Sequence, residues 1–260
     1  WTTGFNISTV KNEVIDIGRD EPIITGGIAQ ISNIALIQEG LPVYSFYGYE
    51  IEGVWQTGDD FSSTTDPVAP GDIKFKDQTG DGAVTPEDRV VLGNSFPDFT
   101  WGLSNTFTYK GFELFAFFEG VQGVSMFNLN LAESYFPISF RRNKLADLYL
   151  NRWTPDNPSN EYPSFVNPNG QAGKQVNSKT VEDASYIRLK TVRLSYNIPT
   201  TNLKFLRDLQ VYVSGSNLFT ITDYNGFDPA SNTNGNANLR IDYNAYPLNR
   251  TITVGLNVGF

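Results

Sequence analysis

The sequence predicts an all-β fold, and three observations support this prediction. Gly (23), Phe (19) and Tyr (13) are frequent among the 260 residues, whereas charged residues make up 18%, below the roughly 25% that is usual in soluble domains. Several segments alternate apolar and polar residues with the period of two that is typical of strands. The connections between these segments alternate between short and long. The length suits one large β domain or a part of a larger protein.

The composition excludes several classes of function. The net charge is -9, whereas proteins that bind nucleic acid neutralise phosphates with clustered Lys and Arg, so we expect no nucleic-acid partner. The chain has no His and no Cys, which excludes imidazole and thiolate metal sites and nucleophiles activated by His. No apolar run approaches the length of a transmembrane helix. Strands of a membrane β-barrel are shorter and give a weaker signal, so the composition does not exclude a membrane β-barrel.

The first strand is expected at residues 1–9, WTTGFNIST, where Trp, Phe and Ile alternate with smaller polar residues. Because the sequence begins inside a strand, we expect it to be the tail of a longer chain. A polar turn is expected at Lys11. Aromatic-rich β segments follow at 28–37 and 42–55, and they lead to a long polar loop over 56–97.

The middle of the chain predicts a hairpin. DFTWGLSNTFTYK (98–110) alternates apolar and polar residues, and Lys110-Gly111 forms a tight turn. The returning strand FELFAFFEG has aromatic residues on both faces, so we expect it to be covered on both sides for part of its length. A long loop over 125–183 follows. It contains FRRNKLADLYLNRW (140–153), whose Leu and aromatic residues recur at the spacing of a short amphipathic helix.

A second hairpin is expected in the last third of the chain. SYIRLKTVRLSYNIP and LQVYVSGSNLFTI are joined by a short connection from Pro199 to Asp208. The apolar face of the first strand switches near Thr191, where a bulge would restore it. An Asn-rich loop then leads to TITVGLNVGF, whose apolar residues share one face up to Phe260.

The connection lengths favour a transmembrane β-barrel over a β-sandwich, because barrels have short turns on one side of the membrane and long loops on the other. We expect about seven strands in total. The long loops then lie together outside, and they end at Pro97, Asp183 and Asn249. The short turns lie together inside, at Lys11, Lys110 and Pro199.

The motif with the most specific chemistry is DQTGDGAVTPED (77–88), which has the residue spacing of a calcium-binding loop. Calcium takes about six to eight oxygen ligands, and Gly82 permits the sharp bend that the loop requires. The match is imperfect, because a Thr stands where Asp or Asn is usual and the twelfth residue is Asp rather than Glu. The expected ligands of a structural Ca²⁺ are Asp77, Thr79, Asp81, the carbonyl of Ala83, and Asp88.

A second interpretation of the same loop needs no metal. The residues after the Gly-rich turn have the order of a capped helical turn, with Thr85 as N-cap, Pro86 at the first position and Asp88 three residues after the cap. Both interpretations can hold together. Paired acids such as Glu50 and Glu52 would serve a glycosidase only across a cleft, and no such cleft is indicated, so we expect no enzyme.

Taken together, segments along nearly the whole chain resemble the C-terminal part of SusC/RagA-like TonB-dependent outer-membrane transporters. No single segment is specific, but their combination in this order is. The segments are LPVYSFYGYEIEGVW, the run from Pro70 to Gly120, RWTPDNPSN, DASYIRLKTVRLSYNIP, VYVSGSNLFTITDYNGFDP and YPLNRTITVGLNVGF.

The resemblance implies that residues 1–260 contribute about seven C-terminal strands to a large antiparallel transmembrane β-barrel. Residues 56–97 and 125–183 would be extracellular loops, and the second would contain the short helix. The plug domain and early strands of the family are missing from this sequence. Terminal aromatic residues of such barrels are read by the assembly machinery, a role that falls here to Phe260.

The implied function is import of large nutrients, oligosaccharide or peptide, across the bacterial outer membrane. The implied partners are an extracellular SusD-like lipoprotein, outer-membrane lipid, and TonB, which supplies energy through the missing N-terminal region. The alternative is a secreted, soluble β-sandwich that binds carbohydrate and uses structural calcium to order its loops.

Overall fold

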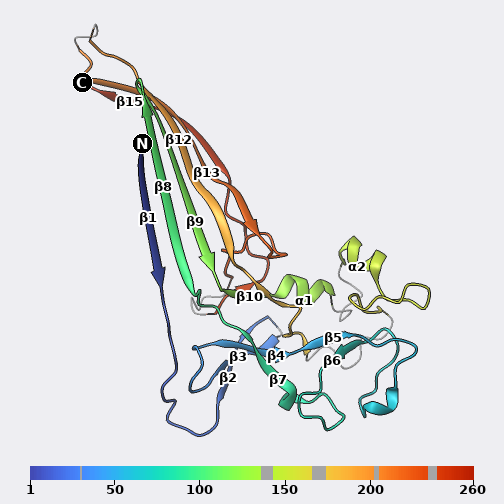
Figure 1. Ribbon diagram of the computed structural model, residues 1–260. Coiled ribbons are helices and arrows are strands. Elements are labelled where there is room, and N and C mark those ends of the chain that lie inside the picture. Colours follow the sequence, from blue (N-terminus) through green and yellow to red (C-terminus); the bar gives the residue numbers. More distant parts are fainter. Residues whose placement is uncertain (30, 136–142, 166–173, 202–204, 234–238) are drawn as a thin grey trace.

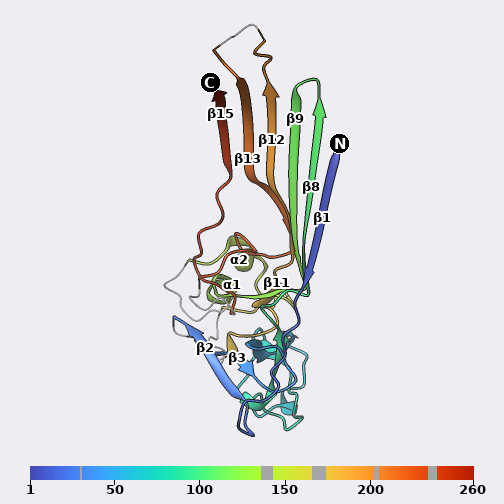
Figure 2. The same ribbon diagram turned by 90° about the vertical axis from the view of Figure 1, so that its left-hand side faces the viewer.

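A tall curved sheet dominates the computed structural model, and a group of shorter elements lies at one end of it (Figures 1 and 2). Within the described residues, six antiparallel strands form this sheet, here called the wall sheet. In spatial order they are β1 (Thr2–Thr9), β8 (Phe99–Tyr109), β9 (Phe112–Gln122), β12 (Tyr186–Asn197), β13 (Asp208–Thr222) and β15 (Thr251–Gly259). The structure describes residues 1–29, 31–135, 143–165, 174–201, 205–233 and 239–260.

Residues paired across strands lie on the same face of the wall sheet, and along most of the sheet one face is apolar and the other polar, although Phe115 and Phe117 of β9 lie on the polar face. One such row is apolar throughout and crosses five strands: Phe5, Leu103, Phe118, Leu189 and Phe219. We call the face of this row the apolar face. The row next to it lies on the opposite, polar face: Asn6, Gly102, Glu119, Arg188 and Thr220.

The apolar face is exposed rather than packed. On β15, Ile252 is 72% and Val254 is 80% exposed, although both belong to a well-paired strand. No charged residue of the wall strands pairs within this face in the described registers, since Glu113, Glu119 and Arg193 all pair within the polar face. A sheet of this kind presents a continuous apolar surface to its surroundings.

A β-bulge in β12 confirms the switch expected near Thr191. Leu189 pairs with Phe118 and Thr191 pairs with Phe117, so Lys190 has no partner on β9. The extra residue keeps the apolar side chains after it on the same face as those before it. The Lys190 Nζ atom lies 3.3 Å from Glu119 Oε1 on the neighbouring strand.

The position of β1 corrects one prediction. Thr9 pairs with Phe99, so β1 ends where β8 begins, at the opposite end of the wall sheet from the Lys110-Gly111 turn. The expectation that the turn at Lys11 shares an end with the other short turns is therefore wrong. Alternation identifies a strand but not its partner, and the polar residues after β1 open a long excursion instead of a hairpin.

The predicted β segments at 28–37 and 42–55 belong to this excursion, so the wall sheet has six described strands rather than about seven. Three smaller sheets and the helices form a group that we call the loop body. Its strands are β2 (Ile23–Ile28), β3 (Ile31–Ile37), β4 (Ser45–Tyr49), β5 (Ile51–Val54), β6 (Ile73–Phe75), β7 (Arg89–Gly93), β10 (Ser125–Asn128), β11 (Val181–Asp183) and β14 (Ile241–Asp242). Its helices are α1 (Leu129–Tyr135), α2 (Ala146–Asn151) and the 3-10 turns η1 (Phe61–Ser63) and η2 (Pro86–Asp88).

The expected amphipathic helix in 140–153 is confirmed as α2, although residues 140–142 lie outside the described residues. The segments 56–97 and 125–183 both belong to the loop body, and 136–142 and 166–173 of the second segment also lie outside the described residues. In the part of the chain that is described, no helix is both long and apolar enough to cross a membrane.

The buried core lies in the loop body. Its largest cluster joins elements that are distant in sequence, and its members are at most 7% exposed. They include Ile34, Phe46, Phe127, Leu129 and Ile241. The loop body therefore has an apolar interior, as soluble proteins do, whereas the wall sheet exposes the apolar residues of one face.

The contact between Tyr212 and Gly255 on the polar face generates a prediction about the last strand. A Cβ atom at Gly255 would overlap the Tyr212 ring, which is also held by the Arg193 guanidinium 4.2 Å from its centroid. We expect Gly255→Val to destabilise the β13–β15 pairing by ~1–3 kcal/mol through overpacking. The measurement is the urea midpoint of the full-length protein. Thr253→Val, on the same strand and face, is the control, and equal midpoints for the two variants would refute the overpacking.

Candidate functional site

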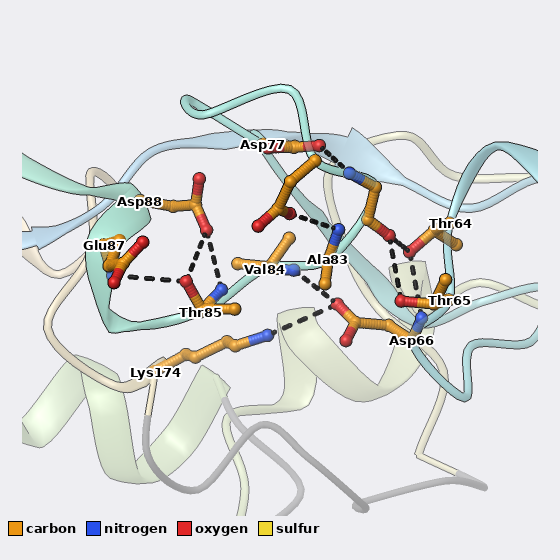
Figure 3. A network of polar contacts seen from close by, with 12 residues as sticks. Thr64, Thr65, Asp66, Asp77, Ala83, Val84, Thr85, Glu87, Asp88 and Lys174 are labelled. Atoms are coloured by element: carbon orange, nitrogen blue, oxygen red, sulfur yellow. Dashed lines mark hydrogen bonds and ion pairs between the residues drawn. The ribbon is translucent and has the colours of Figure 1, made fainter.

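The predicted calcium loop, residues 77–88, lies between β6 and β7 (Figure 3). The carboxylate of Asp88 is its centre and is fully buried. Its Oδ1 atom accepts hydrogen bonds from Gln78 N at 2.8 Å, Thr79 N at 3.0 Å and Thr79 Oγ1 at 3.1 Å. Its Oδ2 atom accepts from Thr85 N at 2.6 Å and Thr85 Oγ1 at 3.3 Å. One side chain thus ties both ends of the loop together.

These hydrogen bonds also set the charge of Asp88. Burial raises its pKa, but the hydrogen bonds donated by Thr79, Thr85 and Gln78 outweigh burial and hold the pKa below its ordinary value of 3.8. The carboxylate is therefore ionised at neutral pH. Its negative charge lies at the first turn of η2, where the free N–H groups favour an anion.

The other two acidic residues among the predicted ligands, Asp77 and Asp81, also accept hydrogen bonds from the backbone, whereas the predicted ligand Thr79 donates from its Oγ1 atom to Asp77 and Asp88. Asp77 accepts from Gly80 N at 2.6 Å and from Gly82 N at 2.7 Å, and both glycines have positive φ angles, 73° and 84°. Asp81 accepts from Ala83 N at 2.9 Å. Positive φ is favourable for glycine, so these two residues permit the tight turn around Asp77.

The geometry matches the capped-turn interpretation of the loop. The N-cap Thr85 accepts from Glu87 N at 3.3 Å, and Asp88 reaches back to Thr85 N, as in a capping box. Among the described residues, no group of three or more acidic side chains is arranged to hold a metal ion. Backbone N–H donors suit an anion, whereas Ca²⁺ needs oxygen atoms. Calcium binding at this loop stays a prediction.

A contact that the sequence did not indicate fixes the loop to its surroundings. Asp66 Oδ2 accepts from Val84 N at 2.9 Å and lies 3.8 Å from Lys174 Nζ (Figure 3). Burial lowers the pKa of Lys174, and the nearby Asp66 carboxylate opposes this. A cavity of about 230 Å³ lies beside the pair and is also lined by Trp55 and Asp77. No sequence motif connects Lys174 with a loop about ninety residues before it.

The remaining predicted site residue, Phe260, follows the last residue of β15 and is 89% exposed. Strand β15 forms one edge of the wall sheet, and β1 forms the opposite edge. Its proposed recognition by assembly machinery stays a prediction.

The loop geometry predicts that Asp88 and Asp81 differ sharply in importance. Asp88→Ala removes the acceptor of five hydrogen bonds, so we expect faster proteolytic cleavage within 77–88 with calcium or with chelator. Asp81→Ala removes one hydrogen bond at an exposed position and leaves cleavage in chelator unchanged. Limited proteolysis of the full-length protein with mass-spectrometric mapping measures both.

The same experiment tests calcium. If the loop binds Ca²⁺, wild-type cleavage slows when calcium replaces chelator, and Asp81→Ala abolishes this slowing. Identical wild-type cleavage in the two buffers would remove the calcium interpretation. Wild-type cleavage rates for Asp88→Ala would remove the role assigned to the hydrogen-bond network.

The lowered pKa of Asp88 predicts an acid transition of the loop. A carboxyl with a depressed folded-state pKa contributes stability above its unfolded value of 3.8 and loses it as pH falls through the folded value. We therefore expect hydrogen-exchange protection of the Thr79 and Thr85 amides to stay constant from neutral pH to about 5 and to fall below about 4. Asp88→Asn should abolish this transition, and a transition that persists in Asp88→Asn would assign it to another group.

The chain is similar in sequence to known TonB-dependent receptors. No protein-family model matches the chain. TonB-dependent receptors P26 and P3 of Formosa agariphila are each 35% identical to it over 272 and 276 residues, which is 100% of this chain and 27% of each relative. TonB-dependent receptor SusC of Bacteroides thetaiotaomicron is 25% identical over 274 residues, which is 24% of its length. The chain spans about a quarter of the length of these relatives.

Solved structures show the same fold. The RagAB peptide transporter aligns with 99% of this chain and 26% of its own, with a TM-score of 0.77 at 22% identity. The RagAB peptide importer in its open-open state aligns with a TM-score of 0.72 at 23% identity. The mostly β architecture with few helices thus corresponds to a portion of such a receptor. Over its whole length, the chain is similar to a portion of the TonB-dependent receptors of the SusC/RagA type.

Proposed function

We propose that the wall sheet is part of the transmembrane β-barrel of a SusC-like, TonB-dependent importer in the bacterial outer membrane. The observation that carries this proposal is the exposed apolar face, which continues across the paired wall strands without a charged side chain. Such a face is unfavourable in water and complementary to lipid. The relatives are named receptors and importers, which agrees with the expectation that the chain is not an enzyme.

The strand dimensions fit this placement. Strands β8 and β9 each have 11 residues, and a tilted strand needs about 9–11 residues to span a bilayer. In the proposed barrel the apolar face meets lipid and the polar face lines the interior. The loop body, with 56–97 and 125–183, is then extracellular, and the Lys110-Gly111 turn is periplasmic.

The proposed cargo is a large nutrient, either oligosaccharide or peptide. Similarity to structures named as a peptide importer supports the peptide. The proposed partners are a SusD-like lipoprotein over the extracellular side and TonB, which would act through receptor segments outside this sequence. In this setting a calcium ion at 77–88 would be structural, and Phe260 would serve assembly.

The alternative, a secreted β-sandwich that binds carbohydrate, requires a second sheet over the apolar face. Throughout the described residues, the side chains of β15 on that face are exposed, so nothing supplies that layer. The observations therefore favour the importer.

A matched pair of substitutions on β8 tests the proposal. Leu103→Arg places a charge on the apolar face, where a lipid-facing Arg costs about 2–4 kcal/mol near the bilayer centre. The adjacent Ser104→Arg places the same charge on the polar face. We expect Leu103→Arg to reduce the heat-modifiable, detergent-extracted full-length protein in outer-membrane fractions strongly, and Ser104→Arg to reduce it little. Equal yields, or a wild-type protein that is monodisperse without detergent, would refute the membrane placement.

A further inference from the structure

Arg250 is a charged residue at the border of the apolar face of the wall sheet. It directly precedes β15, and counted in steps of two along the chain it belongs with Ile252 and Val254, which lie on that face. Arg250 is exposed, and within the described residues no carboxylate forms an ion pair with it. Its positive charge is therefore uncompensated next to a surface that is otherwise apolar.

The length of β15 places Arg250 at the extracellular boundary of the bilayer in the proposed barrel. The strand has 9 residues, and a tilted strand needs about 9–11 residues to span a bilayer. Its last residue, Gly259, lies at the same end of the wall sheet as the Lys110-Gly111 turn, which the proposed function places in the periplasm (Figure 2). Arg250 is then at the level of the lipid head groups, and the exposed Ile252 and Val254 extend from it toward the acyl chains.

A cavity of about 390 Å³ extends from Arg250 toward the loop body. β15 pairs with β13 only up to Ser216, and the cavity is lined by Phe219 and Thr220 beyond that point. Figure 2 shows that β13 continues here toward the loop body without β15 beside it. The lining also includes Phe227, which is 81% exposed. An exposed ring above a polar floor suits a head group with both apolar and polar surfaces.

The charged residues of the lining leave one positive charge unbalanced. They are Arg188, Asp228 and Arg250. The first two are buried and form an ion pair, and the Asp228 carboxylate also accepts from Leu248 N at 3.0 Å. Asp228 is thus engaged by other groups, and Arg250 remains to bind an anion. A guanidinium matches a phosphate group especially well, because two parallel N–H groups reach two phosphate oxygens.

Two hydrogen bonds fix the segment that carries Arg250. Leu248 N donates to Asp228 Oδ2, and Asn217 Nδ2 donates to the Asn249 carbonyl at 3.0 Å. The main chain of Arg250 therefore follows two residues that are held against the cavity. The floor offers a donor as well, since the Thr220 hydroxyl accepts from Arg188 Nε at 2.9 Å and, among the described residues, donates to no other group.

We propose that a phosphorylated glycolipid of the outer leaflet binds at the extracellular end of β15. Its phosphate pairs with Arg250, its sugar head group occupies the cavity against Phe227 and Thr220, and an acyl chain follows Ile252 and Val254. A soluble anion would contact Arg250 alone, whereas this lipid uses all three surfaces together. The inference rests on the proposed function, because it requires the wall sheet to cross the outer membrane.

The test uses the full-length receptor in octaethylene glycol monododecyl ether, a detergent without sugar or phosphate. The probe is diphosphoryl lipid A, and its dissociation constant is measured by native mass spectrometry. Phosphatidylglycerol lacks the sugar, monogalactosyl diacylglycerol lacks the phosphate, and inorganic phosphate lacks both sugar and acyl chains. The variants are Arg250→Gln and Phe227→Ala, and Arg19→Gln, at an exposed arginine between β1 and β2, is the matched control.

We expect Arg250→Gln to weaken lipid A binding at least tenfold and Arg19→Gln to leave it unchanged, with all variants heat-modifiable like wild type. Phe227→Ala should weaken binding of lipid A about fivefold or more and leave binding of phosphatidylglycerol unchanged, because only lipid A places a sugar on the ring. The galactolipid should bind wild type at least tenfold more weakly than lipid A does.

Wild-type affinity for lipid A in Arg250→Gln would overturn the proposal, as would equal affinity for the galactolipid or for phosphatidylglycerol. Displacement of lipid A by an equal concentration of inorganic phosphate would assign Arg250 to a free anion instead. A receptor that binds no lipid A would also overturn the site. Outer-membrane fractionation of wild type is scored separately. A receptor absent from the membrane refutes the proposed function, whereas a membrane-located receptor without lipid A binding refutes only this site.

Discussion

The structure depends on one constraint: each wall strand pairs its main chain with its neighbours while its side chains alternate between two faces. A register slip of one residue would move Glu119 and Arg188 onto the apolar face and Phe118 and Leu189 onto the polar face. The bulge at Lys190 is where β12 would otherwise break this alternation. The bulge takes up one extra residue, so the apolar side chains of β12 before and after it lie on the same face of the sheet.

The loop body follows a different rule, although it is built from the same chain. It has a buried apolar core, and the buried carboxylate of Asp88 is held by hydrogen bonds. The Lys174–Asp66 pair adds a link to that loop from a distant segment. The chain therefore has two parts with opposite placement of apolar residues, and they meet at the ends of the wall strands (Figure 1).

The alternation of apolar and polar residues and the turn residues predicted those parts of the fold that depend on neighbouring residues in the sequence. The hairpin around Lys110-Gly111 combines a turn signal with clear alternation, and the bulge near Thr191 is visible as a phase change in one strand. The partner of β1 was not predictable in this way, because it lies beyond a long excursion. The Asp88 loop shows the other limit: side-chain spacing does not reveal whether oxygen atoms face a cation or backbone N–H groups.

The insertion of the excursion between β1 and β8 has a consequence for the order in which the chain folds. A two-residue turn brings β8 and β9 together, whereas the Trp1–Asn105 contact between β1 and β8 joins residues 104 positions apart. Loop-closure entropy makes such distant pairing slow compared with local hairpins. The hairpins therefore form early and β1 docks late. Until β1 pairs with it, β8 is an edge strand with unpaired N–H and C=O groups. Such an edge can pair with another chain, so the folding sheet must be protected from aggregation.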